Sequence, residues 1–240
     1  MNPLSARTLE TSEIMERLFN AYGPQHWWPA KTRFEVIVGA YLTQNTAWRN
    51  VELAIKNLRR ARMISPSALH RAKVSTLEQL IRPSGYYRQK AANLKAFVQY
   101  LYTNYSGSLS NLFRRATPTL RRELLSLPGV GPETADCILL YAANRPVFVV
   151  DVYARRLLFR HRLVRQDSSY AEIQSLVESQ FAASPGRSAS DLTQKLNEFH
   201  ALIVEVGKHH CRKEARCQNC PLQSCLPDED TVSPSERILR

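Results

Sequence analysis

Residues 127–151, LPGVGPETADCILLYAANRPVFVVD, decide the fold. The Pro-Gly-Val-Gly run at 128–131 separates two helical patterns, and its two glycines permit backbone angles that a side chain would forbid. Pro132 suits the first turn of the second helix. Helices joined in this way leave unpaired N–H groups at a helix start, which suit a nucleic-acid phosphate. Gly-x-Gly alone still favours an ordinary helical hairpin, so a function depends on what the rest of the chain adds.

Outside this hairpin, apolar residues recur mainly at helical spacing, and Gly, Pro and Ser mark the loops. Three capping boxes are predicted, at Thr32–Glu35, Ser75–Glu78 and Ser169–Glu172. Residues 147–150 are mostly β-branched, but this run is too short and isolated to indicate a sheet. The sequence therefore predicts an all-α protein. The main expected helices cover residues 13–22, 34–42, 47–60, 65–72, 75–81, 89–105, 169–181 and 188–210.

Length and charge limit the classes of function. A chain of 240 residues can bury a real core, as one large domain or as two lobes. Its net charge of +12 favours a polyanionic partner. No apolar run reaches transmembrane length and no signal-peptide pattern opens the chain, so we expect a soluble cytoplasmic protein with no membrane partner.

Four cysteines gather near the C-terminus, at Cys211, Cys217, Cys220 and Cys225. Such crowding does not resemble the disulfide framework of a secreted protein. Four closely spaced thiolates suit either a tetrahedral zinc ion or an iron–sulfur cluster, and the spacing alone does not decide between them.

The LPGVG hairpin, the downstream Asp151 and the cysteine tail resemble, in order, the endonuclease III superfamily of helix-hairpin-helix DNA glycosylases. The resemblance runs from about Phe19 to Cys225 and implies a two-lobed helical fold with a C-terminal cysteine-ligated cluster loop. It also implies a monomer that binds double-stranded DNA containing a damaged base and associates with the nucleoid. The implied parts are residues 1–30, which join the second lobe, a helical barrel lobe at 31–145 with its hairpin at 119–143, a second lobe at 146–226 with its cluster loop at 211–225, and a tail at 227–240.

The same resemblance assigns the cysteines to a [4Fe–4S] cluster. Family members have first and last spacers one residue longer than those seen here, whereas the order and the short middle spacer match. A [4Fe–4S] cluster is therefore preferred over zinc. It would tie down a loop rich in lysine and arginine, beside Lys208, and so concentrate positive charge for phosphates.

Asp151 is the expected catalytic residue. Breaking an N-glycosidic bond develops positive charge on the sugar, and a fixed carboxylate lowers that barrier and orients or deprotonates water. Without the resemblance, an aspartate that caps the following helix is the preferred interpretation, and the two roles are compatible.

Glu133 occupies the position at which bifunctional members of the superfamily carry a lysine. Glutamate cannot form a Schiff base, so the sequence predicts a monofunctional glycosylase with little or no lyase activity. Glu133 either lines the base pocket or caps its helix, and both interpretations stay open.

The run Trp27-Trp28-Pro29 resembles the branch of the superfamily that excises 3-methyladenine. A methylated purine is cationic, and an aromatic face attracts a cation. Packing in the core is the alternative for this loop, and the pattern alone favours it. Trp48 belongs either to the core or to the pocket.

The remaining expected site residues contact DNA. By resemblance, Gln44 fills the gap left by the flipped nucleotide and Tyr86 enters the opposite strand, while Gly129, Val130 and Gly131 approach a phosphate. The alternatives are a surface polar residue for Gln44 and buried packing for Tyr86.

Two other functions stay open. Ala40 stands where adenine-mismatch relatives place a carboxylate, which counts against that substrate. Uracil or thymine opposite guanine is the second choice for the substrate. A DNA-binding protein that kept the scaffold without catalysis is the non-enzymatic alternative.

Overall fold

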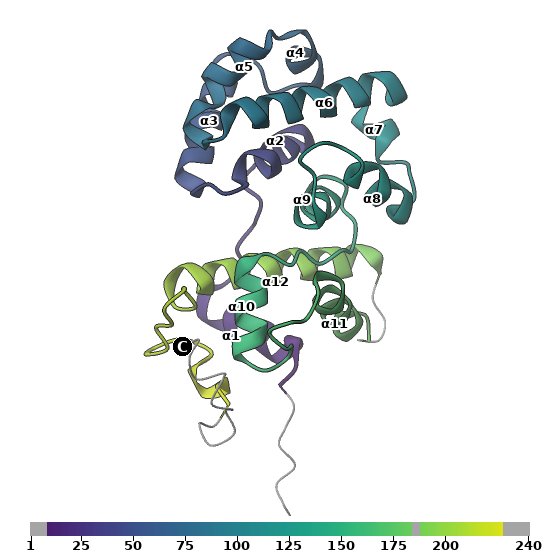
Figure 1. Ribbon diagram of the computed structural model, residues 1–240. Helices are drawn as coiled ribbons and strands as arrows, with labels where there is room; N and C mark the ends of the chain where they lie inside the picture. The colour runs from purple at the N-terminus through teal and green to yellow at the C-terminus, as the bar shows by residue number, and fades with distance from the viewer. Residues whose placement is uncertain (1–8, 184–187, 228–240) are drawn as a thin grey trace, which may run out of the picture. The chain divides into compact units, whose positions relative to one another are not determined.

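The computed structural model describes residues 9–183 and 188–227, and within them every regular element is helical (Figure 1). The extended run at 147–150 forms no strand, and an isolated bridge joins Cys211 to Ala215. The prediction of an all-α protein is confirmed. The longer helices are α1 (Thr11–Tyr22), α2 (Arg33–Thr43), α3 (Trp48–Arg60), α5 (Val74–Ile81), α6 (Tyr87–Tyr105), α8 (Thr117–Leu125), α10 (Val152–Arg160), α11 (Tyr170–Ala182) and α12 (Ala189–His209). The shorter ones are α4 (Pro66–Arg71), η1 (Arg82–Ser84), α7 (Leu109–Leu112), α9 (Pro132–Cys137), η2 (Ile138–Ala142) and η3 (Gln223–Cys225).

The chain divides into two compact units. One unit is continuous, from Trp28 to Arg145, and the other combines the residues up to Trp27 with those from Pro146 onward. The structure divides the chain after Trp27, whereas the sequence led us to expect a boundary after Ala30. The expected tail, 227–240, lies outside the described residues except for Pro227.

The continuous unit is built around α2, which is buried from Phe34 to Leu42 and packs against α3, α6 and η2. Helix α6 also packs against α4, α5 and α7. Thr32 caps α2 by accepting a hydrogen bond from the Glu35 amide at 3.1 Å. The Glu35 carboxylate bonds instead to the Lys31 amide and the Arg59 guanidinium, so the expected capping box is only half formed.

The hairpin joins α8 to α9, and η2 continues α9 as a turn of π-helix. An ion pair fastens its two helices, because Arg121 donates to both carboxylate oxygens of Asp136 at 2.7 and 3.0 Å. Gly129 has a φ of +73°. The expectation for Gly131 is wrong, since its φ of −90° lies in the extended region that any residue adopts.

The discontinuous unit consists of α1, α10, α11 and α12, and the long α12 packs against the other three. Gly207 allows α12 and α10 to approach closely, because a Cβ there would lie 2.3 Å from the Tyr153 ring. Phe148, Phe181 and Phe199 form its aromatic core. Ser169 and Glu172 form the expected capping box. The box expected at Ser75 is wrong, since α5 begins one residue earlier with Lys73 at its N-cap.

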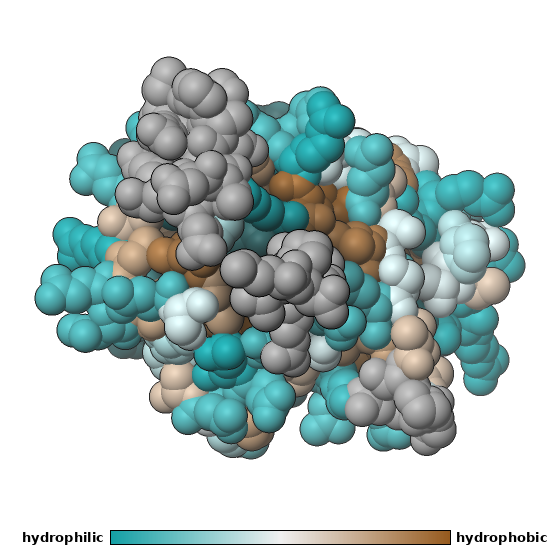
Figure 2. All heavy atoms as spheres, turned by 90° about the horizontal axis from the view of Figure 1, so that it is seen from below, coloured by the Kyte–Doolittle hydropathy of each residue, from teal (hydrophilic) through white to brown (hydrophobic). Residues whose placement is uncertain are grey.

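One face of the molecule is largely hydrophilic, with hydrophobic residues visible in a central band (Figure 2). Within residues 9–183 and 188–227, no helix has both the length and the apolar character needed to cross a membrane.

Candidate functional site

Asp151 lies where the buried extended run at 147–150 meets the start of α10. Its Oδ1 accepts a hydrogen bond from the Ala154 amide at 2.7 Å, so the helix cap that the sequence allowed is present. Its Oδ2 lies 3.6 Å from Nε2 of His200 on α12. The carboxylate is 13% exposed, which leaves it an edge open to solvent. The start of a helix interacts favourably with a carboxylate, so the arrangement fixes the position of this side chain.

Sequence reasoning missed His200. It is buried within the apolar run of α12, and its ring also meets that of Phe148 edge-on at 6.3 Å. A histidine among apolar residues was the available signal, but only the packing of α12 against α10 brings it to Asp151.

Trp28 and Trp48 lie together in the continuous unit, with ring centroids 5.4 Å apart and planes at 82°. Tyr141 adds a third ring, 5.2 Å from Trp28. Gly39 makes the room, because a Cβ there would be only 3.1 Å from the Trp28 indole. Both tryptophans are half-buried, so the group packs against α2 and keeps part of its surface accessible. Tyr141 was not expected, since its position depends on the π-helical turn of η2.

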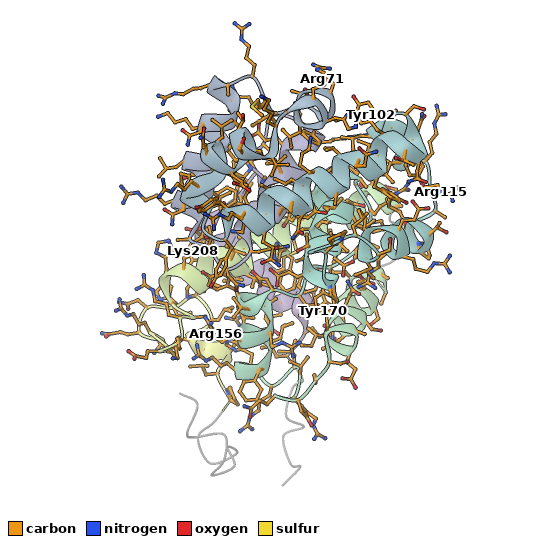
Figure 3. The ribbon with its side chains drawn as sticks, turned by 45° about the horizontal axis from the view of Figure 1, so that its top comes forward. Arg71, Tyr102, Arg115, Arg156, Tyr170 and Lys208 are labelled. Carbon is orange, nitrogen blue, oxygen red and sulfur yellow. The ribbon has the colours of Figure 1, made fainter. Side chains whose placement is uncertain are left out.

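Trp27 contacts a different partner. The ammonium of Lys208 lies 5.1 Å from its ring centroid, in a cation–π contact within the discontinuous unit. Lys208, on the last turn of α12 (Figure 3), also lies 3.7 Å from a carboxylate oxygen of Glu205. The two neighbouring tryptophans therefore belong to different units and contact different residues. Pro29 is exposed.

Gln44 ends α2 and is held against the hairpin. Its side-chain amide donates to the Gly129 carbonyl at 2.8 Å and to the Thr134 hydroxyl at 2.9 Å. Gly129 and Gly131 are exposed, whereas Val130 is buried at 7% exposure. Glu133 is exposed in the first turn of α9. The structure thus brings Gln44 and the hairpin loop together in one unit.

Tyr86 projects into solvent. It is 69% exposed and adopts a left-handed φ of +45° immediately before α6. Its neighbour Tyr87 is half-buried, with the guanidinium groups of Arg82 and Arg88 about 6 Å from its ring centroid. Of the two tyrosines, Tyr86 is the one available to a partner.

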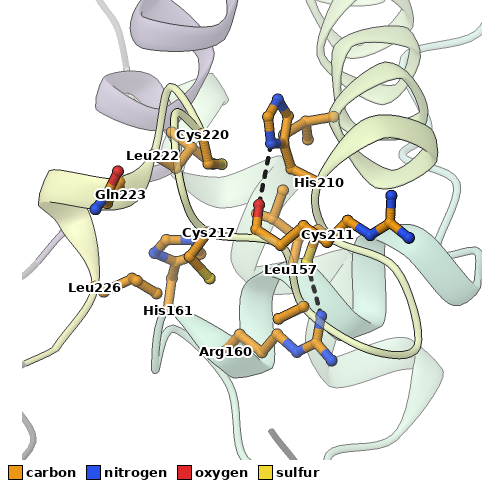
Figure 4. A pocket seen from close by; sticks show the side chains of 13 residues that line it. Leu157, Arg160, His161, His210, Cys211, Cys217, Cys220, Leu222, Gln223 and Leu226 are labelled. Carbon is orange, nitrogen blue, oxygen red and sulfur yellow. Dashed lines mark hydrogen bonds between the residues drawn. The ribbon is translucent and has the colours of Figure 1, made fainter.

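The four cysteines of the C-terminal loop are half-buried and form no disulfide. Three of them, Cys211, Cys217 and Cys220, line a pocket (Figure 4). In the described part of the chain, no group of three or more His, Cys, Asp or Glu side chains is arranged to hold a metal ion.

The pocket combines apolar walls with a basic side chain. Leu157, Val206, Leu222 and Leu226 give it apolar walls, and Arg160 donates to the Cys211 sulfur at 3.4 Å. Burial raises the pKa of Cys220, and the neighbouring cysteines add to that rise. A positive centre among the sulfurs would offset this effect.

Residues 38–182 match the family described as HhH-GPD superfamily base excision DNA repair protein. The chain is 43% identical over 217 residues to MJ1434 of Methanocaldococcus jannaschii, which is named as a DNA repair glycosylase. That match covers 89% of this chain and 94% of the relative. Endonuclease III of Thermotoga maritima is 29% identical over 192 residues, which cover 80% of this chain and 81% of that protein.

Solved structures agree on the fold. The 3-methyladenine DNA glycosylase MagIII of H. pylori, bound to 1,N6-ethenoadenine, matches with a TM-score of 0.71 and 32% identity, covering 83% of this chain and 98% of that one. A trapped endonuclease III–DNA covalent intermediate matches with a TM-score of 0.73 and 23% identity, covering 91% and 96%. The chain therefore belongs to the HhH-GPD superfamily of base excision DNA repair proteins, and it is a DNA repair glycosylase of that family.

Proposed function

We propose that this glycosylase is monofunctional and removes alkylated purines of the 3-methyladenine type from double-stranded DNA, leaving an abasic site. The observation that carries the proposal is the carboxylate of Asp151, fixed at the start of α10 by the Ala154 amide and open at one edge. The similarity to the H. pylori 3-methyladenine glycosylase, at 32% identity over most of both chains, supports the substrate class.

Asp151 acts on the sugar and not on the base. As the N-glycosidic bond lengthens, the deoxyribose gains positive charge, and a carboxylate already in place stabilises it without reorganisation. The same carboxylate orients the attacking water and accepts its proton. Because Oδ1 is engaged by the Ala154 amide, we assign the reacting role to Oδ2, which also lies 3.6 Å from His200 Nε2.

The aromatic residues recognise the flipped base. Trp28, Trp48 and Tyr141 offer ring faces and edges in one unit, and Trp27 lies in contact with the Lys208 ammonium in the other. A cationic purine gains from an aromatic face and is already a good leaving group, so it needs little help from a general acid. Substrate choice is therefore expected to follow the charge of the base.

DNA contacts come from Gln44, Tyr86, the loop at Gly129–Gly131 and Lys208. Gln44 and the hairpin loop are joined by hydrogen bonds, and the exposed Tyr86 ring has the form of a stacking wedge. The protein acts as a monomer on nucleoid DNA. Since Glu133 provides no amine, the reaction ends at the abasic site.

We assign a [4Fe–4S] cluster, in preference to zinc, to Cys211, Cys217, Cys220 and Cys225. When bound, the cluster supplies structural cross-linking of the loop through four thiolate bonds. Arg160 donates to the Cys211 sulfur, and Arg156 donates to the Cys211 carbonyl at 2.9 Å. These two residues of α10 hold the first ligand in place.

A substrate panel tests the proposal. Purified protein is incubated with duplexes carrying 3-methyladenine, 7-methylguanine, hypoxanthine, uracil or a thymine–guanine mismatch, and the free base is quantified. We expect release of 3-methyladenine, strands that stay intact until alkali is added, and no borohydride-trapped complex on abasic DNA. Release of uracil or thymine alone would mean that the substrate is a pyrimidine and not an alkylated purine. Release of no base from any duplex would leave a DNA-binding protein without catalysis, and efficient trapping would disprove the monofunctional assignment.

A further inference from the structure

Lys90, in the first turns of α6, is a buried cation with polar partners. The residue is 3% exposed, and its Nζ donates to the Leu42 carbonyl at 2.8 Å and to the Ser84 carbonyl at 2.7 Å. Burial lowers its pKa to about 8. A buried ammonium is expensive unless its donors are satisfied, so these two bonds are what makes the position tolerable.

The two carbonyls lie at the ends of two different helices, α2 and η1, each just before a loop. Leu42 precedes Gln44 by two residues at the end of α2, and Ser84 precedes Tyr86 by two residues before α6. The Thr46 hydroxyl also donates to the Ser84 carbonyl, which ties the same loops a second time. Gln44 itself bonds to the Gly129 carbonyl of the hairpin. Lys90 is thus the buried centre of a network that joins the three loops with candidate DNA contacts in this unit.

We propose that Lys90 is a positioning residue for base flipping, which holds the Gln44 loop and the Tyr86 loop in register so that both side chains enter the duplex together. This inference rests on the proposed function, because it assumes that Gln44 and Tyr86 enter DNA. Its physical basis is the shared donor. Because both loops bond to the same ammonium, movement of either loop breaks a bond to Lys90, and the bond from Thr46 to Ser84 joins the two loops directly.

Lys95 provides a matched comparison on the same helix. Its Nζ donates to three carbonyls at the end of α4, those of Leu69, His70 and Ala72, at 3.0, 2.6 and 2.9 Å. There α4 packs against α6, and His70 stacks on Tyr102. Figure 3 labels Arg71 of α4 and Tyr102 of α6 in this region. None of the predicted DNA contacts lies at this end of α4. Lys95 therefore caps a helix, and its loss removes a similar number of bonds without touching the flipping loops.

The test compares the full-length variants Lys90→Met and Lys95→Met with the wild type. Hydrogen–deuterium exchange is followed by mass spectrometry in peptides covering 42–46, 84–86 and 69–73. Binding is measured to a duplex with a tetrahydrofuran abasic analogue and to the undamaged duplex. A 2-aminopurine opposite the analogue reports unstacking by its fluorescence.

We expect Lys90→Met to speed exchange in 42–46 and 84–86 together, to lower the preference for the tetrahydrofuran duplex at least about tenfold, which is roughly 1.4 kcal/mol, and to reduce the fluorescence rise. Lys95→Met should speed exchange in 69–73 and leave both the preference for the tetrahydrofuran duplex and the fluorescence rise unchanged. If Lys90→Met unfolds, Thr46→Val removes the second tie and should shift exchange and preference in the same direction.

The Lys90 inference is overturned if Lys90→Met matches Lys95→Met in duplex preference, or if the two loops exchange independently. Where Lys90→Met does not fold, unchanged exchange and preference in Thr46→Val overturn it equally. A wild-type protein that prefers the tetrahydrofuran duplex while Lys90→Met keeps that preference defeats the inference alone. A wild-type protein with no preference defeats the proposed function, and the inference with it.

Discussion

Gly129 leaves no room for a side chain. Its φ is +73°, and a Cβ there would lie 1.9 Å from Nδ2 of Asn93. Gly131 has an extended backbone, and a Cβ there would meet nothing within 4 Å. The two glycines of the hairpin therefore serve different purposes. Gly129 is required by the backbone conformation and by the contact with Asn93, whereas Gly131 leaves space outside the loop.

Replacing each glycine by alanine separates these purposes. Gly129→Ala should lower the free energy of unfolding by about 2 kcal/mol or more, because it adds left-handed strain to the Asn93 clash. Gly131→Ala should change stability by less than about 0.5 kcal/mol, but it should weaken DNA binding if a phosphate approaches there. Urea titrations and duplex binding of both variants check this. Equal stability losses would contradict the assignment.

The buried Lys90 makes stability depend on pH. Folding lowers its pKa from 10.5 to about 8, so the unfolded chain binds more protons between those values. Stability of the wild type should therefore rise relative to Lys90→Met as the pH increases from about 8 to 10.5, and the difference should be constant below about 8. Melting temperatures across this range measure it. Parallel curves for the two proteins would be inconsistent with a depressed pKa.

Some residues of the site could be identified from the sequence, and others could not. Asp151 could be singled out because an acidic residue followed an apolar run, and its helix cap is present. His200 and Lys90 could not, since their partners lie 49 and 48 residues away in the chain and only tertiary packing brings them together.

At the scale of elements, the hairpin depends on the ion pair between α8 and α9. Asp136 is fully buried and bonds to Arg121 through both oxygens. Asp136→Asn leaves the guanidinium without its counter-charge and should cost about 3 kcal/mol. The control is Asp167→Asn, because the Arg165–Asp167 pair is exposed and its loss should cost less than about 1 kcal/mol. Equal costs in denaturant titrations would mean that burial does not matter here.

The cluster loop depends on α10. Arg160 bonds to the Cys211 sulfur and to the carbonyls of Arg212 and Lys213, at 2.7 and 2.9 Å. Arg160→Met should therefore lower the iron content of the purified protein and hasten the loss of visible absorbance in air. Arg165→Met, an exposed arginine of the same unit, is the control. Iron analysis that shows no difference between the variants would separate Arg160 from the cluster, and a colourless zinc protein would overturn the cofactor assignment.

Helix positions followed from periodicity and caps. The capping box at Ser169 was predictable because Ser and Glu stand three apart before an apolar run, and it is formed. The same pattern at Ser75 failed, because backbone amides of the first turn bond to the Lys73 carbonyl and the helix starts earlier. The local sequence pattern does not show which of two nearby residues, Lys73 or Ser75, forms the N-cap.

For the molecule as a whole, the order of the motifs predicted the fold. It did not predict that the aromatic residues expected at the site fall in two different units. Trp27 and Trp28 are adjacent in sequence, yet the chain divides between them. Trp28 joins Trp48 and Tyr141, whereas Trp27 joins Lys208. The separation of Trp27 from Trp28 could not be predicted from the sequence, since neighbours along the chain need not share a packing environment.

The most direct test is a single-turnover measurement of 3-methyladenine release from a duplex by the wild type and by Asp151→Asn. Asparagine is as good a helix cap as aspartate, so the variant should fold and bind the duplex as the wild type does. We expect the wild type to release the base and the rate to fall at least about 100-fold in the variant. An Asp151→Asn protein that releases the base at the wild-type rate would contradict this expectation.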